Sequence, residues 1–382
     1  MNSEGVFSGR LRRIFRKCLG VQMIFDLAKV RTNTEKSRGS KSHFDFIDES
    51  ALEEHVKVRV LLNKALEVFS GEARSEIISR IKKNDEEKFH SVCFELLVAF
   101  IFKQLDCEIE EHPNIIGSEK HPDFFIKFKS GESFYLELVT VQEYDDWSLE
   151  ECKRFIRDLR DEEYYLNINS VDGRDLSHDE YKEFRGNIKK WWTINKKIKN
   201  SKLVWKNFDE SFSIELEILE TSDLGLSSMF VWVNFHTQLL KSLKKKAKRY
   251  GDLEHPYIIA TTFRPSSFSI GLQQMPELLE RTLYGGASIF NPETGQTELL
   301  RNLWNTNTQT QTYNNVSGVL FFDEMNVYRV FEPFKYCLFL NDFSNRPAPS
   351  VLQSLFNFYY VKDNESYQGN RLVLNSLFNS CI

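Results

Sequence analysis

The 382-residue sequence lacks the cysteine pattern of a disulfide-bonded or zinc-binding protein. Its six cysteines are scattered along the chain without a Cys-x-x-Cys pair. Such spacing indicates neither a disulfide framework nor a zinc site, and it favours a reducing compartment. No apolar run approaches the roughly 18 residues that a membrane span needs, and residues 11–30 lack the apolar region and cleavage pattern of a signal peptide. We therefore expect a cytoplasmic location and no membrane partner.

The sequence also lacks a Gly-rich phosphate loop and any kinase, helicase or hydrolase motif. An energy-coupled function would therefore have to come from a partner chain. The net charge of −5 excludes a protein that is polybasic throughout, but residues 1–41 hold ten basic residues against three acidic ones. This asymmetry indicates an anionic partner at that end of the chain, or else a solvated tail.

Three acids stand in one stretch whose pattern predicts a helix and then two strands. Glu95 is the only charge on an apolar helix face that runs from Val92 to Phe102. Asp123 opens one strand and Glu137 lies inside the next, among apolar neighbours, where a buried carboxylate needs a partner. Converging carboxylates suit a hard divalent cation and phosphodiester cleavage. The alternative is that each acid caps a backbone or pairs with a lysine.

In this order, Glu95, Pro122-Asp123 and Glu137 resemble the motif of the PD-(D/E)XK phosphodiesterase superfamily, which has the restriction-endonuclease-like fold. The Lys-rich segment 239–251 and the apolar run 256–260 are similar to that family's second core helix and the strand after it. The resemblance implies an α+β fold with the core order helix, three strands, helix, strand.

The resemblance also implies a metal-dependent endonuclease that hydrolyses DNA. Asp123 and Glu137 would hold Mg²⁺ or Mn²⁺, and Glu95 would assist. Bacterial defence against foreign DNA would be a natural setting, with a homo-oligomer or a partner protein of a defence system. RNA is an alternative substrate.

One position departs from the family pattern. The family carries a lysine two residues after the strand glutamate, and this position is Val139. Lys127 on the Asp123 face of the neighbouring strand, or Lys246 on the second core helix, would then be a migrated lysine. Alternatively, Lys127 is simply solvated and Lys246 belongs to a basic helix face. A third possibility is that catalysis has been lost and the chain is a nucleic-acid-binding or scaffold protein.

Two basic segments are candidate nucleic-acid contacts. The predicted helix 236–250 contains no acid, and Leu239, Leu240, Leu243 and Ala247 would dock its other face. Its basic residues are Lys241, Lys244, Lys245, Lys246, Lys248 and Arg249. Lys189 and Lys190 adjoin Trp191 and Trp192, which suits stacking beside phosphate neutralisation. An ordinary amphipathic helix, with at least one tryptophan in the core, is the alternative interpretation there.

The pattern divides the chain into four parts. Residues 1–48 form a basic N-terminal segment and linker, and residues 49–85 form helices that precede the core. Residues 86–265 form the nuclease-like core, with a large insertion at about 142–228 that has its own helices and strands. Residues 266–382 form a C-terminal extension that contains β-strands.

Overall fold

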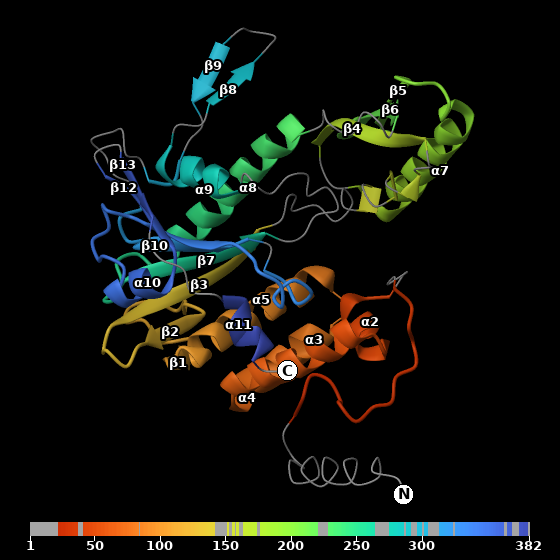
Figure 1. Ribbon diagram of the computed structural model, residues 1–382. Coiled ribbons are helices and arrows are strands. Elements are labelled where there is room, and N and C mark those ends of the chain that lie inside the picture. Colours follow the sequence, from red (N-terminus) through yellow and green to blue (C-terminus); the bar gives the residue numbers. More distant parts are fainter. Residues whose placement is uncertain are drawn as a thin grey trace, which may run out of the picture. The chain divides into compact units, whose positions relative to one another are not determined.

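The protein is a mixed α+β chain in its computed structural model (Figure 1), so the predicted fold class is confirmed at this level. Two compact units are present: unit 1 comprises Met1–Thr140, Tyr250–Thr262 and Asn315–Ile382, and unit 2 comprises Val141–Arg249 and Phe263–Asn314. The structure describes residues 22–36, 41–83, 85–141, 151–152, 155–156, 158–159, 163–173, 176–220, 228–263, 275–285, 288–291, 296–299, 302–304, 313–323, 325–362, 365–368 and 374–380.

Unit 1 is built on an eight-stranded mixed sheet in the order β1-β2-β3-β7-β10-β11-β12-β13. Two neighbouring pairs, β7–β10 and β11–β12, are parallel, while β1–β2, β2–β3, β10–β11 and β12–β13 are antiparallel. The strands are β1 (Glu108–Glu111), β2 (Phe124–Lys127), β3 (Ser133–Val141), β7 (Tyr257–Phe263), β10 (Gly318–Phe322), β11 (Tyr336–Leu340), β12 (Phe358–Lys362) and β13 (Glu365–Gln368). Strands of the predicted C-terminal extension therefore share one sheet with β2 and β3.

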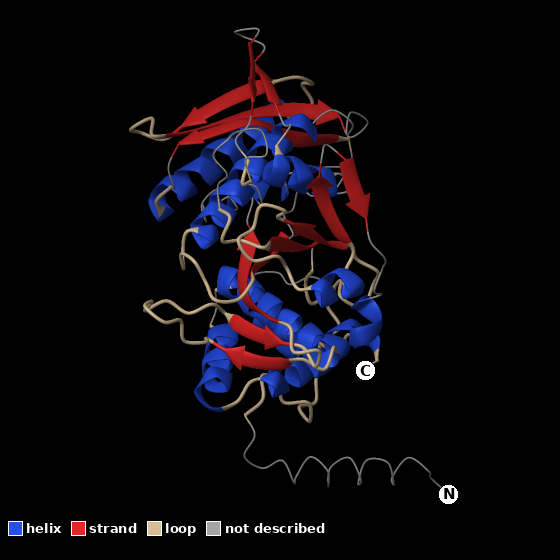
Figure 2. Ribbon diagram, turned by 90° about the vertical axis from the view of Figure 1, so that its left-hand side faces the viewer, coloured by secondary structure: helices blue, strands red, loops and turns tan. Residues whose placement is uncertain are grey.

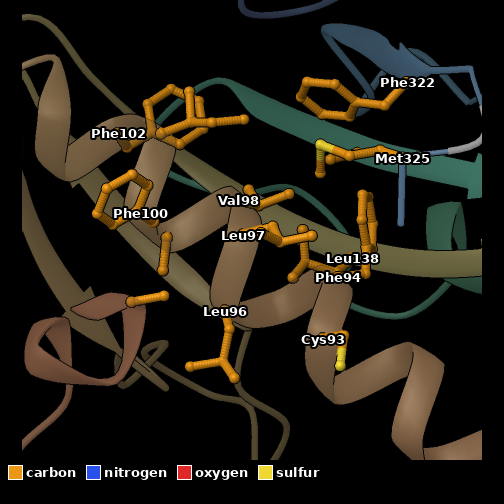
Figure 3. Close-up of a cluster of buried hydrophobic side chains, with 14 of the residues drawn as sticks. Cys93, Phe94, Leu96, Leu97, Val98, Phe100, Phe102, Leu138, Phe322 and Met325 are labelled. Carbon is orange, nitrogen blue, oxygen red and sulfur yellow. The ribbon is translucent and has the colours of Figure 1, made fainter. Parts of the chain in front are cut away.

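Helix α5 (Glu86–Gln104) is the central helix of unit 1. Its first turn is capped by Asp85, whose side chain accepts from the backbone N–H of Lys88. Side chains on every side of its second half are buried, as expected for a helix that is apolar all round. Figure 3 shows several of them in the core, together with Leu138 of β3 and Phe322 of β10. The apolar face of β2 and β3 thus packs into the same core as α5.

Further helices complete the core of unit 1, on the same side of the sheet as α5 (Figure 1). They are α2 (His43–Glu49), α3 (Glu53–Ala65) with the 3-10 turn η1 (Leu66–Val68), α4 (Gly71–Lys82) and α11 (Leu374–Asn379), while α10 (Ser350–Leu355) precedes β12. Helix α2 corrects the prediction that a linker extends to residue 48. Ser42 caps this helix, and burial of Phe46 and Ile47 stabilises it.

Unit 2 contains a three-stranded sheet in the order β4-β6-β5, packed on helix α7 (His178–Asn195). Its strands are β4 (Tyr164–Gly173), β5 (Lys202–Lys206) and β6 (Phe212–Glu220). Figure 2 shows the helices of the protein in blue and its strands in red. A second group pairs α8 (Ser228–Ala247) with α9 (Met275–Tyr284), and the hairpin β8 (Ser288–Asn291)–β9 (Gln296–Leu299) follows. The predicted insertion at about 142–228 therefore contains helix α7 and three strands of its own.

The order of elements along the chain is α5, β1, β2, β3, α8, β7, once the strands and helix of the insertion are set aside. This order matches the predicted sequence of helix, three strands, helix and strand. Strand β7 lies beside β3 in the sheet, although more than a hundred residues separate them in sequence. Among the described helices, none has both the length and the apolar character that crossing a membrane requires.

Candidate functional site

Asp123 directly precedes β2, and Glu137 lies within β3, the strand that pairs antiparallel with β2. The last aligned pair is Phe124 with Leu136, so Asp123 and Glu137 occupy the next pair of positions along the hairpin. Directly opposed residues of antiparallel strands face the same side of a sheet. Because Phe124 and Leu136 enter the core with α5, the two acids face the other side.

Direct contacts hold the Asp123 side chain against β3. One of its carboxylate oxygens, Oδ2, accepts a 2.6 Å hydrogen bond from the backbone N–H of Leu138, the residue after Glu137. The carbonyl of Asp123 accepts from the N–H of His112, which has a positive φ of 47°. Asp123 is therefore fixed on both its side chain and its backbone, close to the Glu137 backbone.

Glu137 is completely buried and hydrogen-bonded to Tyr250. The Tyr250 hydroxyl lies 2.5 Å from Glu137 Oε2 and 2.6 Å from the carbonyl oxygen of His121. Hydrogen bonding of this kind offsets the cost of removing a carboxylate from water. Tyr250, which is more than a hundred residues from Glu137 in sequence, thus also contacts His121, the residue before Pro122-Asp123.

Glu95 has an arginine partner that the sequence pattern did not reveal. Arg80 Nη2 of α4 lies 2.9 Å from Glu95 Oε2 of α5, and Glu95 is 8% exposed. Burial raises the pKa of Glu95, while Arg80 and His112 lower it. Burial also raises the pKa of Glu111, which His112 lowers and Glu95 raises further. The structure therefore shows Glu95 in a structural ion pair, which was the alternative to a metal-binding role. Its partner is an arginine, where a lysine was expected.

Arg80→Met is expected to lower the free energy of unfolding by about 1–3 kcal/mol at neutral pH, because it leaves the Glu95 carboxylate buried without its cation. The loss should shrink at acidic pH, where the Glu95 carboxyl is protonated. Without Arg80 the folded pKa of Glu95 rises further above its unfolded value, so the folded variant binds the proton more tightly than the unfolded chain and keeps it to higher pH. Stability is then lost as pH rises through that folded pKa.

Urea denaturation at acidic and neutral pH measures this effect. The double variant Arg80→Met/Glu95→Gln serves as the control, since it has no carboxyl at position 95 and should show no extra loss at neutral pH. An equal loss for Arg80→Met at both pH values would contradict the explanation.

The structure does not bring Lys127 to the two acids. Lys127 is exposed and its Nζ lies 3.4 Å from Glu108 Oε2 on β1. Lys127 lies four positions from Asp123 along the chain, which corresponds to about 13 Å in a strand. This placement favours the alternative that Lys127 is solvated, because it belongs to a solvent-exposed ion pair. Val139 is half-buried at the family's lysine position, and Lys246 lies on α8 in unit 2.

The basic face of α8 has the predicted arrangement. Leu239, Leu240, Leu243 and Ala247 are buried, which confirms the docking face. Lys241, Lys245 and Lys248 are exposed, and Lys244, Lys246 and Arg249 are half-buried. On α7, Lys189 and Lys190 are exposed, while Trp192 is in the core and Trp191 packs against it. Both basic segments present charge at the surface of unit 2.

Within the described ranges, no group of three or more His, Cys, Asp or Glu side chains is arranged to hold a metal ion. The Asp123 carboxylate accepts from the N–H of Leu138, the residue after Glu137, and Tyr250 joins the Glu137 carboxylate to the His121 carbonyl. Sequence analysis missed Arg80 and Tyr250. Each lies near a helix end, and although Tyr250 falls within the segment 239–251, nothing in the sequence pattern singles out either residue as a partner of the acids.

Comparisons with protein-family models, with curated proteins and with solved structures found no match.

Proposed function

We propose that this protein is a metal-dependent nuclease with a restriction-endonuclease-like core, hydrolysing DNA phosphodiester bonds with Mg²⁺ or Mn²⁺. The observation that supports the proposal is the hydrogen bond from Leu138 N–H to the Asp123 carboxylate, which holds that carboxylate beside the β3 backbone next to Glu137. Mg²⁺ is commonly bound through one or two carboxylates together with substrate phosphates and water. Two adjacent carboxylates therefore fit such an ion.

Asp123 and Glu137 would hold the metal ion. The chemistry that a divalent ion supplies in such a site is activation of water and neutralisation of phosphate charge. The chain's own contribution is orientation: Leu138 N–H holds the Asp123 carboxylate and Tyr250 holds that of Glu137. In this proposal Glu95 has a structural role. Its ion pair with Arg80 joins α5 to α4, and the two helices pack beneath the hairpin.

The substrate is proposed from the charge of unit 2. Exposed lysines on α8 and α7 can neutralise backbone phosphates without reading sequence. The proposed location is the cytoplasm, and the proposed setting is defence against foreign DNA, alone or with a partner protein. Incubation of the purified protein with supercoiled plasmid or with RNA, in Mg²⁺ or Mn²⁺ and then with a chelator, tests the activity. Metal-dependent cutting of DNA is the expected result, and preferential cutting of RNA would reassign the substrate.

A second candidate is a nucleic-acid-binding protein without catalysis. Val139 at the lysine position, Lys127 paired with Glu108 and Glu95 paired with Arg80 favour it. It predicts DNA binding with no cutting in either metal. The plasmid assay and a binding assay on the same preparation separate the two candidates.

Replacing Lys241, Lys245 and Lys248 together by Gln is expected to weaken DNA binding and to flatten its salt dependence. Each phosphate contact contributes about 1 to the slope of log K against log salt, so the slope should fall by about 2 to 3. Fluorescence anisotropy with a labelled duplex at several salt concentrations measures both. Lys129, Lys199 and Lys206 form the matched control, because they are surface lysines outside the two basic segments. A similar loss in the control would mean that only net charge matters.

A further inference from the structure

The hydroxyl of Tyr250 contacts both chain segments that carry the candidate acids. It lies 2.5 Å from Oε2 of Glu137 on β3, and 2.6 Å from the carbonyl of His121, two residues before Asp123. A hydroxyl has one proton, so these two oxygens share a single donor. The contact therefore links the Glu137 side chain to the backbone that leads into Asp123.

Surrounding groups fix the Tyr250 ring in this position. Tyr250 is 8% exposed, and its ring packs edge-to-face on Tyr257, with 5.6 Å between the ring centroids. Tyr257 opens β7, the strand beside β3, and its N–H donates to Ser317 Oγ. Because a tyrosine has few rotatable bonds, a ring packed in this way holds its hydroxyl at a defined point.

We propose that Tyr250 is a positioning residue for the metal pair Asp123–Glu137, an inference that rests on the proposed nuclease function. Its hydroxyl selects the orientation of the Glu137 carboxylate and ties it to the segment before Asp123, which sets how far apart the two carboxylates lie. Val139, at the family's lysine position, has no polar group with which to hold Glu137. Tyr250 takes over the orientation of Glu137 from a different part of the chain, without supplying a positive charge.

Tyr250→Phe tests this inference, since it removes the hydroxyl and keeps the ring. Residues that orient metal ligands typically contribute 10- to 100-fold to metal affinity. We therefore expect the Kd for Mn²⁺, measured by calorimetry without nucleic acid, to rise by about 10- to 100-fold. The Mn²⁺ concentration for half-maximal plasmid cleavage should rise by a similar factor.

Tyr135→Phe is the matched control. Tyr135 lies on the same strand and the same face as Glu137, but its ring packs on Phe125 and His255. This variant should bind Mn²⁺ as the wild type does. Thermal unfolding with and without Mn²⁺ adds a readout that a purely structural role would not move. Loss of packing lowers both melting temperatures equally, whereas loss of positioning reduces the increase that Mn²⁺ produces.

Each outcome has a distinct meaning. A wild type that neither binds Mn²⁺ nor cuts DNA overturns the proposed function and this inference with it. A wild type that binds Mn²⁺ while Tyr250→Phe binds it equally well overturns the inference alone. A Tyr250→Phe chain that is unfolded by circular dichroism also overturns it, because the role would then be structural.

Discussion

Replacement of Asp123 by Asn is expected to reduce plasmid cleavage by about 10²- to 10³-fold, the usual loss when one electrostatic partner of a reaction is removed. Asn keeps the size of the side chain and retains a carbonyl oxygen that can accept from Leu138 N–H. The fold should therefore survive, while the negative charge that binds a cation is lost. Initial rates of supercoiled-plasmid nicking in Mg²⁺ measure the effect.

Glu137→Gln should produce a loss of the same size for the same reason. The control is Glu110→Gln, because Glu110 is an exposed acid of the same sheet, paired with Phe125 on the face of Asp123. Its removal should leave the rate within about twofold, as expected for a solvated charge away from the reaction. Full activity in Asp123→Asn, or an equal loss in Glu110→Gln, would contradict the assignment.

Asn63→Ala is expected to lower the free energy of unfolding by about 2–4 kcal/mol, because three hydrogen bonds of a buried side chain disappear together. Asn63 Oδ1 accepts from the N–H groups of Ile24 and Phe25, at 3.0 and 3.1 Å, and its Nδ2 donates to the Phe25 carbonyl at 2.8 Å. Ile24 and Phe25 are themselves buried. Without Asn63, their backbone groups would stay in the core with no replacement donor or acceptor.

Urea denaturation monitored by circular dichroism measures this loss as a lower midpoint with an unchanged slope. Asn33→Ala is the matched control, since the Asn33 side chain accepts one exposed, local hydrogen bond from Glu35 N–H. It should cost less than about 1 kcal/mol. Equal losses in the two variants would show that Asn63 does not anchor the segment around Phe25.

Local patterns predicted the elements around the site correctly. The pattern of residues 133–141 predicted a strand with the bounds of β3. The alternation of its side chains placed Glu137 on the face opposite to Leu136 and Leu138. Helical spacing likewise identified the buried face of α8. These features depend on residues a few positions apart, and such spacing is visible in a single sequence.

The partners of the acids could not be predicted, because they come from distant parts of the chain. Arg80 and Tyr250 reach Glu95 and Glu137 only after helices and strands have packed. The addition of β10–β13 to the sheet of β2 and β3 depends on pairing between segments nearly two hundred residues apart. Helix α2 was missed because it has only seven residues and follows a polar, Ser- and Lys-rich stretch.

Manganese binding to the wild type, Asp123→Asn and Glu137→Gln, followed by electron paramagnetic resonance without nucleic acid, tests most directly whether the two carboxylates share one cation. We predict one bound Mn²⁺ per wild-type chain and loss of that site in each single variant, since a hard cation needs both oxygen ligands. Absence of binding to the wild type, or unchanged binding in either variant, would contradict a cation site at the β2–β3 hairpin.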